Sequence, residues 1–292
     1  NKKPLILGIE SSCDETAASL ITENEQGIPI VLSNIISSQI EVHKEFGGVV
    51  PELAARSHME KIDWIVQKAI DDSGRKIEEI DAVASTAGPG LIVCLSVGLS
   101  FGKAFASAIN KPFIAVNHLE GHALSPKLNS KLNYPYLLLL ISGGHSQFLN
   151  VQDLGKYRRL GTTIDDALGE AFDKTAKLLG IDFPGGPQIE ILAKKGDPNK
   201  YNLPKPIFNK GGCNLSFAGL KTAILRITKD IKTDQEKFDL AASFQKTVEE
   251  ILYKKTKIAF NEFEKQNSLK DKIFVVAGGV AANKKIRTML IN

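Results

Sequence analysis

The sequence predicts an α/β protein of two similar lobes, residues 1–132 and 133–292. Segments with strand patterns alternate with segments of helical periodicity, which is typical of an α/β lobe. A strand, a polar turn and a second strand at residues 5–21 are echoed at residues 136–151, which indicates an internal duplication. The lobe boundary is placed near residues 129–135, because this stretch with Asn and Pro separates the two patterns.

The first lobe begins with two short apolar segments, residues 4–9 and 17–21, on either side of the polar residues 11–16. We expect a strand, a turn and a partner strand there. The further elements follow in order: a strand at 28–38, a helix at 58–72, a strand at 82–86, a helix at 91–109, a strand at 113–116 and a helix opening near Asn117.

The second lobe repeats this plan with different residues. The expected elements are strands at 136–141 and 147–151 around a tight turn, helices at 164–179 and 238–263, a strand at 272–277 and a helix from Ala281. The strands at 136–141 and 272–277 lead into turns with glycine pairs, so these turns are candidates for ligand contacts.

Composition excludes several classes of protein. Hydrophobic residues make up 43% and charged residues 24%, as in a globular domain, and the longest apolar run, 137–141, is far too short to span a membrane. The three cysteines are far apart in sequence and form no CxxC pair, so a reducing cytoplasm is the simplest location. The net charge of +4 permits a nucleic-acid partner without requiring one. Lysines are densest at residues 194–232. Judged by charge alone, this stretch is interpreted as a solvated loop and helix face.

His118 and His122 are a candidate metal site. Four residues apart on a helix, they leave the same face one turn apart, which suits one divalent cation bound by two neutral nitrogens. Such a pair can equally be surface or packing residues, but its place after a strand end favours a metal. Glu120 lies about 200° around the helix from His118, so it is misplaced as the general base of a zinc protease.

Three glycine pairs in the second lobe suggest a nucleotide site: Gly143–Gly144, Gly185–Gly186 and Gly278–Gly279. Glycine allows peptide N–H groups to approach phosphate oxygens, although turns also use glycine routinely. Asp173 and Glu190 flank the middle pair and are candidates for binding ribose hydroxyls or an amine, the alternative being ordinary exposed carboxylates. The chain contains no Walker phosphate-binding motif.

Taken together, the motifs resemble the bacterial or organellar TsaD family, the tRNA N6-adenosine threonylcarbamoyltransferases that were formerly described as O-sialoglycoprotein endopeptidases. The resemblance covers residues 5–287 in the family's order. It is carried by ILGIESSCDET (6–16), SSQIEVHKEFGGVVPELAARSH (37–58), AGPGLIVCLSV (87–97), NHLEGH (117–122), ISGGH (141–145), DDALGEAFDKTAKLLGIDFPGGP (165–187), SFAGLKTA (216–223) and VVAGGVAAN (275–283).

The resemblance implies the actin/Hsp70/sugar-kinase fold and a reaction. A threonylcarbamoyl group would pass from threonylcarbamoyl-adenylate to the exocyclic amine of the adenosine beside the anticodon of tRNA. The family also implies a paralogous TsaB-like subunit and a TsaE-like ATPase as partners, and no membrane. The family continues beyond GGVAAN with a strand and helix whose Asp is a further metal ligand. This chain stops at Asn292, before that Asp, so we expect a truncated second lobe and weak metal binding.

The resemblance also implies roles for individual residues. His118 and His122 would bind one divalent ion, Fe²⁺ or Zn²⁺. Asp14 and Glu15 would orient or deprotonate the attacking amine. The substrate's acyl-phosphate region would lie against Ile141, Ser142, Gly143, Gly144 and His145, and its ribose and base against Asp173, Gly186, Glu190 and Asn283.

Two alternatives share this fold. A small-molecule kinase would use glycine turns and carboxylates but has no need of two histidines at positions 118 and 122. A non-catalytic paralogue that only dimerises would resemble the first lobe and typically lack the two histidines, so their presence argues against it.

Overall fold

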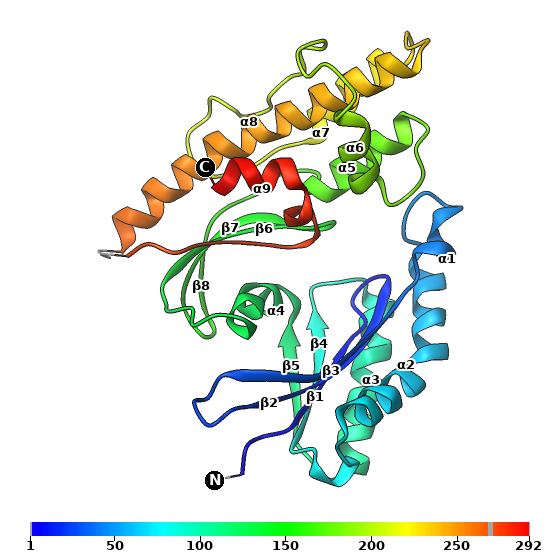
Figure 1. Ribbon diagram of the computed structural model, residues 1–292, viewed down its shortest axis with the longest axis vertical. Helices are drawn as coiled ribbons and strands as arrows, with labels where there is room; N and C mark the ends of the chain where they lie inside the picture. Colours follow the sequence, from blue (N-terminus) through cyan, green and yellow to red (C-terminus); the bar gives the residue numbers. More distant parts are fainter. Residues whose placement is uncertain (1, 268–270, 292) are drawn as a thin grey trace. The chain divides into compact units, whose positions relative to one another are not determined.

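The computed structural model describes residues 2–267 and 271–291, so the last residue, Asn292, lies outside the described residues. The chain divides into two compact units, residues 1–132 and 133–292, and each contains one mixed sheet with helices packed on it (Figure 1). Among the described residues, no helix combines the length and the apolar character needed to cross a membrane.

The first unit contains a five-stranded sheet with the strand order β3-β2-β1-β4-β5. Strands β1, β2 and β3 form an antiparallel meander, whereas β4 and β5 run parallel to β1. The carboxyl ends of β1, β4 and β5 therefore meet at one edge of the sheet, where ligands commonly bind in open α/β sheets. The strands are β1 (Ile6–Glu10), β2 (Glu15–Glu23), β3 (Pro29–Ser38), β4 (Ala82–Gly88) and β5 (Phe113–Asn117).

Helices α2 (Pro51–Ser73) and α3 (Ile92–Ala108) supply the core of the first unit. Pro51 starts α2 because its missing N–H needs no partner in a first turn, and Gly74 ends α2 in the left-handed region at φ 67°. Alternate strand residues such as Leu7 and Leu20 point into this core and are fully buried. Truncating one of them to alanine would cost about 2–5 kcal/mol. The shorter helices are α1 (Ile40–Lys44), η1 (Ile77–Glu79), α4 (His118–Leu124) and η2 (Ser125–Leu128).

Gly98 lets α3 approach the polar turn that follows β1. A Cβ atom at Gly98 would overlap Ser11 Oγ. The Gly98 N–H instead donates to Ser11 Oγ at 3.1 Å, and that hydroxyl donates to the carbonyl of Cys94 at 2.9 Å. Because α3 fixes Ser11 in this way, the residues that follow it are held at a defined position.

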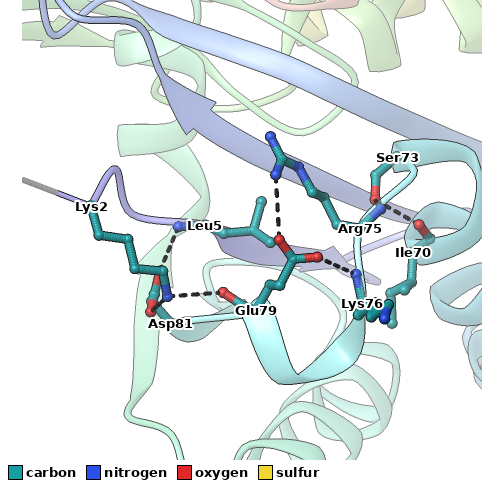
Figure 2. A network of polar contacts seen from close by, with 8 residues as sticks. All are labelled: Lys2, Leu5, Ile70, Ser73, Arg75, Lys76, Glu79 and Asp81. Carbon is teal, nitrogen blue, oxygen red and sulfur yellow. Dashed lines mark hydrogen bonds and ion pairs between the residues drawn. The ribbon is translucent and has the colours of Figure 1, made fainter.

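Polar contacts hold the start of the chain to the segment that precedes β4 (Figure 2). Asp81 accepts from the Leu5 N–H at 3.0 Å and pairs with Lys2 at 2.6 Å. Glu79 accepts from the Lys76 N–H at 2.8 Å and from Arg75 at 3.3 Å. The ion pairs are exposed and contribute little stability, but they set where β1 enters the sheet beside β4.

The second unit repeats the arrangement of the first. Its four-stranded sheet has the order β8-β7-β6-β9, in which β6, β7 and β8 form an antiparallel meander and β9 runs parallel to β6. The strands are β6 (Tyr136–Ile141), β7 (Ser146–Asp153), β8 (Lys156–Thr162) and β9 (Phe274–Ala277). The helices are α5 (Leu168–Leu178), α6 (Gly185–Ala193), α7 (Ala218–Thr228), α8 (Asp234–Gln266), η3 (Gly279–Ala282) and α9 (Lys284–Ile291). The same meander followed by a parallel strand in both units confirms the predicted α/β fold class with duplicated lobes.

Several elements differ from the sequence expectation. Strand β8 and helices α6 and α7 were not expected, and α2 begins at Pro51 rather than at residue 58. The helix expected from residue 164 begins at Leu168, because the Ile164 N–H pairs with the carbonyl of Leu215 and keeps that residue extended. The last helix begins at Lys284, after a 3₁₀ turn, rather than at Ala281.

Candidate functional site

The first candidate site is the pair His118 and His122 on the short helix α4. The helix begins where β5 ends, since the Asn117 side chain accepts from the N–H groups of Leu119 at 2.9 Å and Glu120 at 3.3 Å. The Nε2 atoms of the two histidines lie 3.2 Å apart. With metal–nitrogen bonds of about 2.1 Å, such a pair subtends roughly 100° at one ion. The two imidazoles therefore fit a shared divalent cation.

Glu10 orients His118 from the end of β1. A carboxylate oxygen of Glu10 lies 3.5 Å from His118 Nδ1, and the Ser12 hydroxyl lies 3.3 Å from the same nitrogen. A proton on Nδ1 directed at this carboxylate leaves the lone pair of Nε2 available to a metal. The Thr86 hydroxyl donates to Glu10 at 2.5 Å, and the Ser12 N–H also donates to Glu10. Glu10 is not among the site residues predicted from the sequence.

These contacts stabilise the negatively charged form of Glu10. Burial alone would raise the pKa of Glu10, but hydrogen bonds with His118, Ser12 and Thr86 outweigh burial and lower the pKa to about 2. Glu10 is therefore a carboxylate at any physiological pH. Metal-bound histidines usually donate their second nitrogen to such a group. The signal available in the sequence was a single acidic residue at a strand end.

Among the residues the structure describes, no third His, Cys, Asp or Glu joins the two histidines as a metal-binding group. The described part of the chain therefore offers the nitrogens of these two histidines as candidate metal donors at this position. Asp14 and Glu15 follow the same edge of the sheet, in the turn and at the start of β2. The pKa of Glu15 is raised by partial burial and by the neighbouring charges of Asp14 and Glu10, which makes its carboxylate a stronger base than an ordinary glutamate.

A buried hydrogen-bond chain holds the turn that carries Asp14. The Cys13 carbonyl lies 2.9 Å from His58 Nε2, and the opposite nitrogen of His58 lies 2.7 Å from the Thr16 hydroxyl and 3.3 Å from Gln39 Nε2. The other end of the Gln39 amide contacts His43 Nε2 at 3.2 Å. The side chains of His43 and His58 are fully buried, and Gln39 is 1% exposed.

One assignment of protons satisfies this whole chain. The Val50 N–H donates to His43 Nδ1, so His43 Nε2 carries the proton and donates to the Gln39 oxygen. The Thr16 hydroxyl and the Gln39 amide then both donate to His58 Nδ1, and His58 Nε2–H donates to the Cys13 carbonyl. Both imidazoles are neutral in this scheme, and burial lowers the pKa of each. This chain of hydrogen bonds links α1, α2 and the turn before β2.

The second candidate site is a pocket of about 360 Å³ in the second unit. Four of the residues expected to hold the adenylate line it together, although they are far apart in sequence: Asp173, Gly186, Glu190 and Asn283. Gly143 from the first glycine pair and Gly279 from the third also line the pocket. Phe172, Pro184, Pro187 and Val280 provide apolar walls. An apolar slot with a few polar groups is typical of a small-molecule site.

The polar side chains of this pocket are fixed by backbone groups. Asp173 accepts from the Gly185 N–H at 2.8 Å, and Glu190 accepts from the Lys284 N–H at 3.0 Å. Asn283 accepts from the Ile286 N–H at 3.0 Å and donates to Gln245 at 3.1 Å. Asp173 joins α5 to α6, Glu190 joins α6 to the start of α9, and Asn283 is held by α8 and α9, so the arrangement is preorganised.

Residues 141–145 divide into a buried part and an exposed part. Ile141 is completely buried in the core, so its side chain does not line the pocket. Ser142 and His145 close a tight turn, with the Ser142 N–H donating to the His145 carbonyl at 2.7 Å. Gly143 and Gly144 are exposed in that turn, and Gly278, at φ 97°, passes directly against the Ile141 carbonyl. The exposed part of this strip is therefore the Gly143–Gly144 backbone.

Comparison with known proteins identifies the family. The TsaD family model, tRNA N6-adenosine threonylcarbamoyltransferase, matches residues 30–292. A protein of that name from Pelagibacter ubique (strain HTCC1062) is 80% identical over the whole chain and 82% of the relative's length. This chain belongs to the TsaD family. A second such protein, from Rickettsia massiliae (strain Mtu5), is 54% identical over 98% of the chain and 83% of the relative.

As a member of the TsaD family, the chain is a transferase that modifies tRNA, as the sequence predicted. Among solved structures, the ethanolamine utilization protein EutJ from Carboxydothermus hydrogenoformans is similar with a TM-score of 0.46 and 12% identity. The match covers 99% of this chain and 81% of the EutJ chain.

Proposed function

We propose that this chain transfers the threonylcarbamoyl group of threonylcarbamoyl-adenylate to N6 of the adenosine next to the anticodon of tRNA, releasing AMP. The observation that supports this donor is the pocket of the second unit, where Asp173, Glu190 and Asn283 border an apolar slot beside the Gly143 turn. Carboxylates suit ribose hydroxyls, and the slot suits a purine base. A site of action in the cytoplasm agrees with tRNA as the substrate.

In the proposed reaction, N6 of adenosine attacks the carbonyl carbon of the threonylcarbamoyl group. A carbon–nitrogen bond forms, the bond between that carbon and the phosphate oxygen breaks, and AMP departs with the electron pair. The N–H groups of Gly143 and Gly144 would stabilise negative charge on the donor, and Asp14 or Glu15 would accept the proton lost by N6. The raised pKa of Glu15 supports its use in this step.

We further propose that His118 and His122 hold one divalent ion, Fe²⁺ or Zn²⁺, through their Nε2 atoms. Such an ion would fix the donor and polarise its carbonyl. The 3.2 Å separation of the two nitrogens supports this, and so does the Glu10 carboxylate behind His118. Glu10 would keep the proton of His118 on Nδ1, while the buried chain through His58 would hold Asp14 in position.

Two further proteins belong to this proposal. We expect the chain to act with a paralogous TsaB-like subunit and a TsaE-like ATPase, as the family resemblance implies. The test incubates the chain, with and without the paralogous subunit, with threonylcarbamoyl-adenylate and unmodified tRNA, and digests the tRNA for mass spectrometry. The proposal predicts modified adenosine only where donor is present. Phosphorylation of a small molecule by ATP, with no modified adenosine, would support the kinase alternative instead.

A further inference from the structure

One surface of the second unit is rich in lysine and is separate from the pocket. It is made by residues 194–210, the first part of the connection between α6 and α7, and by the face of α8 on which these residues lie (Figure 1). The segment contains five lysines and one aspartate, and residues 246–257 of α8 contain four lysines and two glutamates. We name this surface the lysine strip and define it by Lys205, Lys210, Lys246, Lys254 and Lys257, with Phe208 and Tyr253.

A buried lysine fixes the lysine strip to the helix. Lys255 has no exposed surface, which is rare for lysine, and its ammonium donates to the carbonyls of Lys210 at 2.9 Å and Gly212 at 3.1 Å. Lys254 adds a hydrogen bond to Asn209 at 2.7 Å, and Lys246 adds one to Asn199. The segment is therefore attached along its length rather than loosely solvated. A fixed array of cations loses less entropy on binding a ligand.

Aromatic rings lie among the cations of the lysine strip. The ammonium of Lys254 lies 4.0 Å from the centre of the Phe208 ring, and that of Lys257 lies 4.4 Å from the centre of the Tyr253 ring. Tyr253 is 47% exposed. Interleaved cations and exposed aromatic rings are typical of surfaces that bind a nucleic-acid backbone and stack on unpaired bases.

Carboxylates neutralise only part of the lysine strip. Glu250 pairs with Lys205, and lies 3.9 Å from Lys246. Within residues 2–267 and 271–291, no carboxylate lies within ion-pair distance of Lys210, Lys254 or Lys257. These three ammonium groups keep their charge available for an anionic partner, so the strip is more than a balanced, solvated face.

We propose that the lysine strip binds the sugar-phosphate backbone of tRNA, outside the pocket of the second unit. This inference rests on the proposed function for the identity of the nucleic acid. The lysines supply contacts without base specificity, and Tyr253 supplies a stacking surface. From charge alone, the dense lysines at 194–232 were interpreted as a solvated face. The proposal gives a binding role to those that α8 holds in place, in residues 194–210.

The test measures binding of unmodified tRNA transcript at several salt concentrations. The variant Lys210→Glu/Lys257→Glu is compared with Lys103→Glu/Lys156→Glu, which changes the net charge equally on other surfaces. Each lost phosphate contact lowers the slope of log affinity against log salt by roughly 0.7–0.9. We expect the strip variant to lose about 1.5 in slope and at least roughly tenfold in affinity, while the control keeps the wild-type slope. Melting temperature and adenylate binding should be unchanged in both.

The binding measurement separates the failure of this inference from that of the proposed function. Equal tRNA binding by the strip variant and the wild type would overturn the lysine strip while leaving the transfer reaction intact. Equal losses in both double variants would also overturn it, because the effect would then be one of net charge. Loss of binding to the paralogous subunit with unchanged tRNA binding would assign the surface to a protein instead. Wild-type protein that binds no tRNA in the presence of that subunit would contradict the proposed function itself.

Discussion

The Nε2 atoms of His118 and His122 lie 3.2 Å apart, one turn apart on α4. At this distance the N–H of one imidazole can donate to the nitrogen of the other, and a cation that replaced this proton would bind both nitrogens. The Glu10 carboxylate behind His118 explains how the ring is held for that purpose.

Removing either imidazole is expected to remove the metal. We predict that His118→Ala and His122→Ala lower the bound divalent metal and reduce transfer at least roughly a hundredfold with little change in the melting temperature, because the side chains are only partly buried. Inductively coupled plasma mass spectrometry of the purified protein measures its metal content, and Lys131→Ala is the control variant. A double variant that keeps the wild-type metal content would show that these histidines are not the ligands.

Glu10→Gln tests the orienting role of the carboxylate without changing its size. We expect metal affinity to fall by about 10–100-fold, since the neutral amide no longer keeps the His118 proton on Nδ1. Competition with a chelator measures the affinity. Unchanged affinity, with the fold intact by circular dichroism, would mean that Glu10 serves packing alone.

The pocket carboxylates are expected to affect the adenylate and leave the metal unaffected. Asp173→Asn and Glu190→Gln keep the size of each side chain and an oxygen for its backbone partner. A hydrogen bond to a charged group is worth about 1.5–3 kcal/mol, so each should weaken binding of a non-hydrolysable adenylate analogue by roughly tenfold or more. Calorimetry measures it, with Asp182→Asn as the control outside the pocket lining. Wild-type affinity in both variants would remove these residues from the site.

The buried histidines predict a loss of stability in acid. Burial lowers the pKa of His43 and His58 in the folded protein below the ordinary 6.5. As the pH falls through 6.5, the unfolded chain takes up protons that the folded protein does not, so the free energy of unfolding decreases. Each histidine contributes a slope of at most about 1.4 kcal/mol per pH unit.

Urea unfolding between pH 7 and pH 5 checks this prediction. The variant His58→Gln retains a polar group but cannot take up this proton, so its stability should depend less steeply on pH. The gap in stability between the wild type and the variant should therefore narrow as the pH falls. A gap that stays constant would mean that His58 titrates alike in the folded and unfolded chain.

The sequence predicted the parts of this protein that depend on local patterns or on the family's motifs. The strands that begin at Tyr136 and Ser146 were predicted from apolar runs beside a glycine turn. The residues that line the pocket were predicted from the family resemblance. Strand β8 was missed because its sequence, KYRRLGT, is largely polar on an edge strand.

The missing parts of the first site depend on contacts between distant segments. Glu10 approaches His118 across more than a hundred residues, and His58 reaches the Cys13 carbonyl from a different helix. No spacing in the sequence signals such pairs. They appear only once β1, β4 and β5 bring their carboxyl ends to one edge of the sheet.

If the chain moves an acyl group from an adenylate to tRNA, the two products form in a fixed ratio, which a single-turnover experiment measures. Labelled threonylcarbamoyl-adenylate is mixed with excess chain, paralogous subunit and unmodified tRNA, and AMP and modified adenosine are measured together. We predict one AMP per modified adenosine, with both products lost in His118→Ala/His122→Ala. AMP release without modified adenosine would contradict the transfer reaction, and modification that persists in the double variant would contradict the role of the two histidines.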